Sequence, residues 1–181
     1  MKKLIILAVF ALLVFGAKAQ EAKETIKWMD FNDAVEACKN EPKLIFIDVF
    51  TDWCGWCKRM DASTFKNPVI AKYMNDKFYA VKFDAERSDT IVFNGYTFTG
   101  TTRADGRKGT HQLAVALLHN KLSYPSYVLM DENFQILQVI GGYQEARQFE
   151  PMIHFFGDRA YQSMSGDDFL KNFKSEFIGL P

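Results

Sequence analysis

Two cysteines separated by two residues are the part of this sequence best suited to chemistry. Cys54 and Cys57 follow an apolar, β-prone run at residues 44–50, and helix-forming residues come directly after them. This order predicts that a strand passes into a helix here, with Cys54 in the first helical turn. Unpaired N–H groups and the helix dipole stabilise an anion at that position, so we expect the Cys54 thiol to have a lowered pKa and to be reactive. Cys57, one turn further along, is expected to be more shielded.

Cysteines at this spacing can close a small disulfide ring, which another thiol can open and which can form at the expense of another disulfide. A structural zinc site is the alternative, but it needs four ligands. The chain offers one such pair, and the spacing of its histidines, which are His111, His119 and His154, is not that of a ligand set. The sequence therefore predicts redox chemistry, with no metal and no bound cofactor.

The elements around the cysteines are predicted to form a parallel pair of strands. A helix over residues 54–65 carries the cysteines, a second helix starts at residues 67–68, and residues 78–84 form the next strand. A strand–helix–strand order implies a right-handed crossover, so both strands end at the sheet edge that carries Cys54.

Two charged residues lie on these strands. Asp48 stands in the apolar run, where desolvation should raise its pKa. It is interpreted either as the acid–base group that takes a proton from Cys57 or as a hydrogen-bonded structural acid. Lys82 on the second strand lies either beside Asp48 or in solvent.

The remainder of the chain is predicted to complete a mixed sheet covered by helices. Helices are expected at residues 28–39 with Asn32 as N-cap, at 112–122, at 144–159 with a kink or a later start at Pro151, and at 166–177, and strands at 126–131 and 135–140. Cys38 falls on the apolar side of the first helix. We interpret it as a core residue, with a redox or partner-linking role as the alternative.

Residues 87–109 form an insertion after the second parallel strand. Asn94-Gly95 between two apolar runs is a strong hairpin signal, and a polar, glycine-bearing loop follows at residues 100–109. By its place in the chain the insertion should border the cysteines. It is predicted to help choose the substrate, and the alternative is a surface hairpin without a role.

Residues 53–58, Trp-Cys-Gly-Trp-Cys-Lys, resemble the active-site motif of the thioredoxin superfamily. Asp48, six residues before the first cysteine, matches the buried acid of that family, and Lys82 matches its lysine. Trp56 departs from the pattern, because thioredoxin has proline there and disulfide isomerases have histidine. The resemblance covers about residues 27–160 without the insertion, and is closest to exported bacterial thioredoxin-like proteins.

The resemblance implies a thioredoxin-like α/β fold: a central mixed sheet flanked by helices, with an inserted hairpin and loop and an extra C-terminal helix. It also implies that Pro125 is a cis-proline facing the cysteines and that Tyr124 offers backbone groups to an incoming peptide. The expected substrate-binding residues are Trp53, Gly55, Trp56, Tyr124 and Pro125. The tryptophans are expected to shield the site and to offer a docking surface, with core packing as the alternative for Trp53.

The N-terminus has the pattern of a secretory signal peptide over residues 1–19: a short basic start, 13 apolar residues and an A-x-A cleavage site. An uncleaved anchor is the alternative. The mature chain from Gln20 would keep 19 basic and 22 acidic residues, a net charge of −3, which argues against nucleic-acid binding. Export would bring the chain to an oxidising compartment, where a protein held together by disulfides would carry more than three cysteines, so we expect the cysteines to be catalytic. Residues 20–181 are expected to form one domain.

Together these features predict an exported thiol–disulfide oxidoreductase, periplasmic or secreted, that reduces protein disulfides through Cys54 and Cys57. Reduction is favoured over oxidation because Asp48 and Lys82 resemble the acid and lysine of thioredoxin. Its predicted partners are protein disulfide substrates and, as electron donor, a membrane-bound thiol reductase. The alternatives are a disulfide oxidase or isomerase, and a client-binding module with incidental redox activity.

Overall fold

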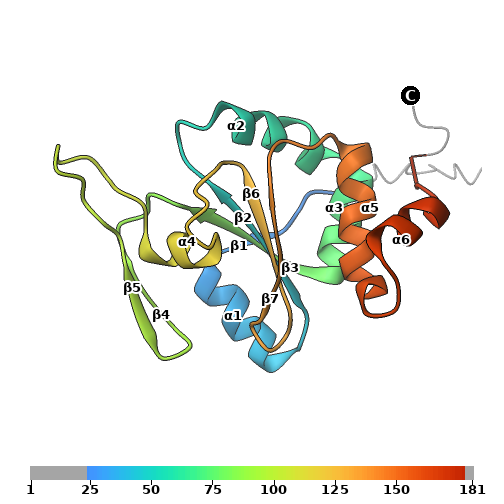
Figure 1. Cartoon of the computed structure of the whole chain (residues 1–181), viewed down its shortest axis with the longest axis horizontal. Helices are drawn as coiled ribbons and strands as arrows, with labels where there is room; N and C mark the ends of the chain where they lie inside the picture. The colour runs from blue at the N-terminus through green and yellow to red at the C-terminus, as the bar shows by residue number, and fades with distance from the viewer. Residues whose placement is uncertain (1–23, 178–181) are drawn as a thin grey trace, which may run out of the picture.

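The computed structural model describes residues 24–177, which fold around one mixed sheet of five strands (Figure 1). The strand order is β1-β3-β2-β6-β7, in which β1, β3 and β2 run parallel and β6 and β7 are antiparallel to their neighbours. The strands are β1 (Trp28–Met29), β2 (Leu44–Phe50), β3 (Phe78–Asp84), β6 (Ser126–Met130) and β7 (Ile136–Gly141). The expected thioredoxin-like fold is confirmed.

Helices cover both faces of this sheet. The helices are α1 (Phe31–Asn40), α2 (Gly55–Ala62), α3 (Pro68–Lys77), α4 (Gln112–Leu117), α5 (Ala146–Gly157) and α6 (Gly166–Asn172). Alternate residues of β2 point to opposite sides, as a strand requires. Ile45 and Ile47 pack in a cluster with α1 and α4, whereas Leu44 and Phe46 pack in a second cluster with α2, α3 and α5.

The first helix begins later than expected, which corrects the predicted helix at residues 28–39 and its N-cap. Trp28 and Met29 form a short edge strand that pairs with Ala80 and Val81. Asp30 then caps α1 by accepting a hydrogen bond from the backbone of Asn32, so Asn32 itself lies inside the helix. These pairing partners lie about fifty residues away in the sequence. The local helical spacing of apolar residues cannot reveal them, and it therefore predicts a helix at residues 28 and 29.

Three other helices are shorter than predicted. The predicted helix at residues 54–65 is α2 followed by a 3-10 turn over Thr64–Lys66. The predicted helix at 112–122 stops at Leu117, because His119 and Asn120 adopt positive φ angles of 49° and 64°. The predicted C-terminal helix at 166–177 stops at Asn172. Pro151 lies inside α5, which runs through it.

The insertion is a two-stranded hairpin, β4 (Thr90–Phe93) and β5 (Tyr96–Thr99), as predicted. Asn94 and Gly95 have φ angles of 51° and 79°, which fits the turn expected of this dipeptide. The hairpin packs on the α1 and α4 side of the sheet, where Ile91 is fully buried and the Phe93 ring contacts Phe134.

The hairpin tip therefore lies near the β6–β7 turn, at the sheet end opposite the cysteines. The expectation that the insertion borders the cysteine end of the sheet is therefore wrong for the hairpin, although other residues of the insertion lie at the strand ends. A hollow of about 460 Å³ marks this junction and is lined by Asp30, Phe50, Lys82, Asp84, Arg87, Ser88, Asp89 and Lys108.

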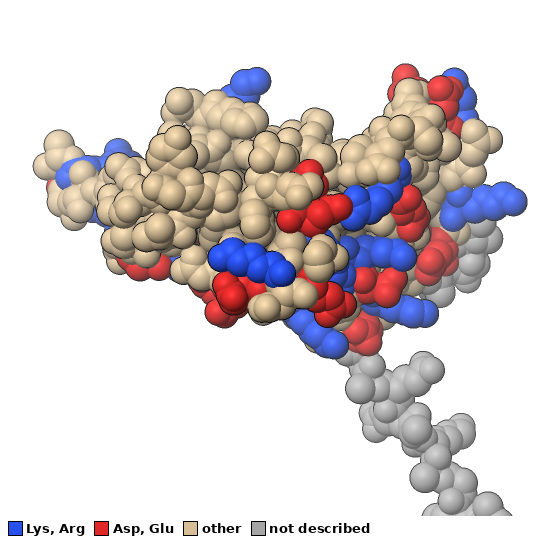
Figure 2. Space-filling view, turned by 90° about the horizontal axis from the view of Figure 1, so that it is seen from below, with Lys and Arg blue, Asp and Glu red and all other residues tan. Residues whose placement is uncertain are grey.

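The predicted signal peptide lies outside the described residues. Within residues 24–177, no helix has both the length and the apolar character needed to cross a membrane. Seen from below (Figure 2), basic and acidic side chains lie interspersed beside a broad uncharged area. On that face of the described chain, charge is not separated into regions of one sign.

Candidate functional site

Cys54 and Cys57 form a disulfide with an S–S distance of 2.06 Å where β2 passes into α2. Cys54 is the N-cap of α2, and its Sγ accepts a hydrogen bond of 3.0 Å from the backbone N–H of Cys57. Both side chains are nearly buried, with 5% of Cys54 and 2% of Cys57 exposed. Cys54 is thus slightly the more accessible of the two, and it accepts an N–H bond of the kind that would stabilise a thiolate.

Two exposed tryptophans flank the disulfide. Trp53 is 66% exposed and its ring meets Tyr124 edge-on at 5.8 Å, so the core-packing alternative for Trp53 is wrong. Trp56 is 57% exposed and lies 5.3 Å from the Tyr143 ring. These four rings make an aromatic rim around the disulfide.

Arg59 makes cation–π contacts with two rings of this rim. Its guanidinium lies 5.6 Å from the Trp56 ring and 5.5 Å from the Tyr143 ring. Sequence reasoning missed both Arg59 and Tyr143. The sequence carried a signal for Arg59, because a residue three positions after Trp56 on a helix lies next to it. It carried no such signal for Tyr143, which the sheet brings to the site.

The Tyr124–Pro125 peptide bond is cis, as the resemblance implied. Ser126 pairs with Val49, so Pro125 lies at the end of β2 from which the chain runs to Cys54. Pro125 is buried, and its carbonyl accepts a 2.8 Å hydrogen bond from Gly142 N–H. The structure thus brings the predicted proline and cysteines to one end of the sheet.

Asp48 and Lys82 pair across β2 and β3, which settles the alternatives for Lys82: its ammonium lies 2.6 Å from Asp48 Oδ2. The Asp48 side chain is 1% exposed, and its Oδ1 has no hydrogen-bond partner among the described residues. Burial raises the pKa of Asp48 to about 6, and the attraction of Lys82 offsets only part of that effect. A carboxyl in this state can exchange a proton near neutral pH.

Asp61 also binds the Lys82 ammonium, through Oδ1. It lies on α2, four residues after Cys57 and therefore on the same helical face. Sequence reasoning did not single it out, although this spacing was a signal that it had available. The Lys82 ammonium is further enclosed by aromatic rings, those of Trp28, Phe50 and Phe65, at 5.0, 5.1 and 5.3 Å.

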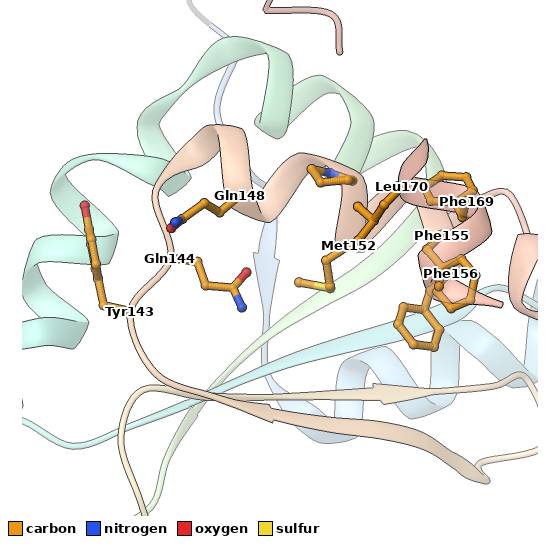
Figure 3. Close-up of a pocket in the computed structure, with 10 residues that line it drawn as sticks. Tyr143, Gln144, Gln148, Met152, Phe155, Phe156, Phe169 and Leu170 are labelled. Carbon is orange, nitrogen blue, oxygen red and sulfur yellow. The ribbon is translucent and has the colours of Figure 1, made fainter. Parts of the chain in front are cut away.

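An apolar groove of about 530 Å³ starts beside the aromatic rim (Figure 3). Tyr143 stands at one end, Met152 lies in the middle, and Phe169 and Leu170 close the other end. The lining comes from α5, α6 and the segment before α5, and none of its residues is charged: Tyr143, Gln144, Gln148, Pro151, Met152, Phe155, Phe156, Gly166, Phe169 and Leu170.

The remaining cysteine and one buried histidine have structural contacts. Cys38 is 1% exposed, and its thiol donates to the Lys43 carbonyl at 3.2 Å, which fits a core residue. His111 caps α4: its Nδ1 accepts from Leu113 N–H, so its Nε2 donates to the Asp89 carbonyl. Burial lowers the pKa of His111, so it acts as a neutral cap that ties the insertion to α4.

Comparison with known proteins supports this picture at the level of family and fold. The family model Thioredox_DsbH, described as a protein of unknown function, DUF255, matches residues 18–139. An uncharacterized protein of Caenorhabditis elegans is 37% identical over 73 residues, which cover 40% of this chain and 10% of that protein. The chain thus spans about a tenth of the length of the curated relatives that it matches.

Two solved structures share the fold. A thioredoxin-fold protein from Helicobacter pylori is 19% identical, with a TM-score of 0.54, and the match covers 83% of this chain and 84% of that one. A structure called DsbH oxidoreductase is 17% identical, with a TM-score of 0.51, and the match covers 72% and 83% of the two chains.

Proposed function

Because this chain belongs to the Thioredox_DsbH family, we propose that it is a thiol–disulfide oxidoreductase that works through Cys54 and Cys57. The observation that carries the proposal is the disulfide at the start of α2, together with a buried carboxyl on the preceding strand, that of Asp48, whose pKa is raised to about 6. This arrangement supplies a nucleophile, a second thiol within bonding reach and a proton acceptor.

In the proposed reaction the reduced protein attacks a disulfide of another protein. The Cys54 thiolate bonds to one target sulfur and the first target thiolate leaves. The Cys57 thiol gives its proton to Asp48 and its sulfur attacks Cys54 Sγ, which releases the second target thiolate. Two electrons pass to the target, and the protein keeps the disulfide seen between Cys54 and Cys57.

We propose that the protein is exported, with residues 1–19 as signal peptide and residues 20–181 as the working domain. Its substrates are then protein disulfides outside the cytoplasm. A membrane-bound thiol reductase is proposed to restore the dithiol, because each turnover leaves the protein oxidised. The aromatic rim and the Tyr124 backbone are proposed to hold the target peptide next to Cys54.

The equilibrium of the cysteine pair with glutathione tests the function and its direction. We expect a reduction potential near that of thioredoxin, about −270 mV, as a reductant requires. A value near about −120 mV would instead support the oxidase alternative. The measurement uses a Cys38→Ser variant, so that Cys54 and Cys57 are the cysteines that can react. The proposal would be wrong if this pair did not exchange with glutathione at neutral pH.

Removing residues 102–108 should change substrate choice, because Lys108 in this loop lines the hollow at the strand ends together with Phe50 and Lys82. Gly109 N–H donates to the Thr101 carbonyl at 2.8 Å, so the two ends of this loop already meet and a short glycine linker can join them. We expect activity on a protein disulfide to fall about tenfold relative to activity on a small disulfide, equivalent to about 1.4 kcal/mol of binding. The measurement is the ratio of the two rates.

This excision leaves the buried part of the hairpin in place, unlike removal of the whole insertion. Ile91 is fully buried and would be lost from the core in the larger deletion. An equal loss on both substrates, or no loss on either, would show that the loop has no part in substrate choice.

A further inference from the structure

The Lys82 ammonium is shared between two carboxylates of very different burial. Asp48 on β2 is 1% exposed and Asp61 on α2 is 44% exposed, and both accept from the same nitrogen. Lys82 itself is 21% exposed, with its stem fixed in β3 opposite Asp48. The ammonium thus joins the buried carboxyl to a carboxylate that water can reach.

We propose that Asp61 is a positioning residue of this site: it engages one N–H donor of the Lys82 ammonium and places a second negative charge beside it, so that the Asp48 anion is stabilised less than in a simple Asp–Lys pair. The effect of Asp61 on the Cys57 step rests on the proposed function, whereas the contacts of Lys82 with both carboxylates do not. An ammonium has three donors, and here two of them go to two different carboxylates, with three aromatic rings within 5.3 Å of the nitrogen.

Two electrostatic effects of Asp61 act on Asp48 in the same direction. Asp61 engages one of the Lys82 N–H donors, which is then not available to Asp48, and its own negative charge disfavours a second anion nearby. Both keep Asp48 more basic than a simple Asp–Lys pair would. The Cys57 proton therefore has a better acceptor, and the resolving step can run at a higher rate near neutral pH.

Other ionisable groups surround this site and remain in every variant. Tyr127 on β6 lies opposite Asp48 in the sheet. The hollow that Lys82 lines also contains Asp30, Asp84, Arg87, Asp89 and Lys108. Arg87 pairs with Asp30 and Asp89, so part of this charge is already balanced.

Titration of the Asp48 carboxyl by NMR in the oxidised protein tests the inference without any turnover. We expect Asp61→Asn to lower the Asp48 midpoint by about one pH unit, because the amide can still hold the ammonium but carries no charge. Lys82→Met should move the midpoint in the opposite direction. Asp61→Glu should restore the wild-type midpoint, and Asp52→Asn, at an exposed position before the cysteines, should leave it unchanged.

The inference is overturned if the midpoint in Asp61→Asn equals that in Asp52→Asn. A parallel single-turnover measurement of resolution against pH should show the same downward shift in Asp61→Asn. If the carboxyl midpoint moves but the cysteines never exchange with a target, the proposed function fails and the inference about Asp61 stands. If exchange is normal and neither the midpoint nor the pH profile moves, the inference alone fails.

Discussion

Replacing Cys54 with serine should reduce turnover of a protein disulfide to the uncatalysed level, a loss of at least about 10³-fold. The hydroxyl of serine is a far weaker nucleophile at neutral pH, and the remaining thiol, that of Cys57, is only 2% exposed and is shielded from a target disulfide. The measurement is reduction of a protein disulfide by the pre-reduced variant, followed as release of target thiols.

Cys57→Ser should behave differently, because the nucleophile remains and only the resolving thiol is lost. We expect this variant to accumulate a covalent complex with its target that a reducing agent releases. Cys38→Ser is the matched control: Cys38 is buried against the Lys43 carbonyl, so its loss should leave both turnover and trapping unchanged.

These variants also separate a catalyst from a client-binding module. A binding module would retain its affinity for clients in both Cys54→Ser and Cys57→Ser and would form no covalent complex with them. Normal turnover in Cys54→Ser would contradict the mechanism altogether.

Asp48→Asn should make the oxidised protein more stable at pH 8 relative to the wild type than at pH 4. The pKa of Asp48 is raised in the folded protein to about 6, against an ordinary value of 3.8. The folded state therefore binds more protons than the unfolded state between these values, so the wild type loses stability as pH rises through this window. The full shift corresponds to about 3 kcal/mol, and asparagine does not titrate.

Urea unfolding of both oxidised proteins at several pH values measures this difference. Asp52→Asn is again the control, because Asp52 is exposed and its loss should shift the curve by a similar small amount at each pH. Stability curves of wild type and Asp48→Asn that stay parallel between pH 4 and pH 8 would contradict the raised pKa. The same variant should slow resolution by Cys57, since the carboxyl that accepts its proton is gone.

Local chemistry made several features readable from the sequence alone. Asn67 caps α3 and Pro68 occupies its first turn, because both act on backbone groups within three residues. Asn94-Gly95 specified the hairpin turn for the same reason. The unbroken apolar run of β2, which is buried along nearly its whole length, and the Cys-x-x-Cys that follows it predicted the cysteine pair at the start of a helix.

Pairings between distant segments were decided only by the tertiary structure. Trp28 and Met29 become a strand because β3 lies beside them, and the insertion turns its tip away from the cysteines because Ile91 and Phe93 find apolar partners on the sheet. The resemblance of the motif implied Lys82, but the bond between Lys82 and Asp61 depends on how α2 packs over β3.

The sequence by itself therefore determined the reactive sulfurs and the kind of element that carries them, since both depend on neighbours along the chain. It did not determine which side chains complete the site. Tyr143 reaches Trp56, and Asp61 reaches Lys82, across gaps that only the packed sheet and helices close. Such contacts follow from the summed packing of many residues, which no short stretch of sequence encodes.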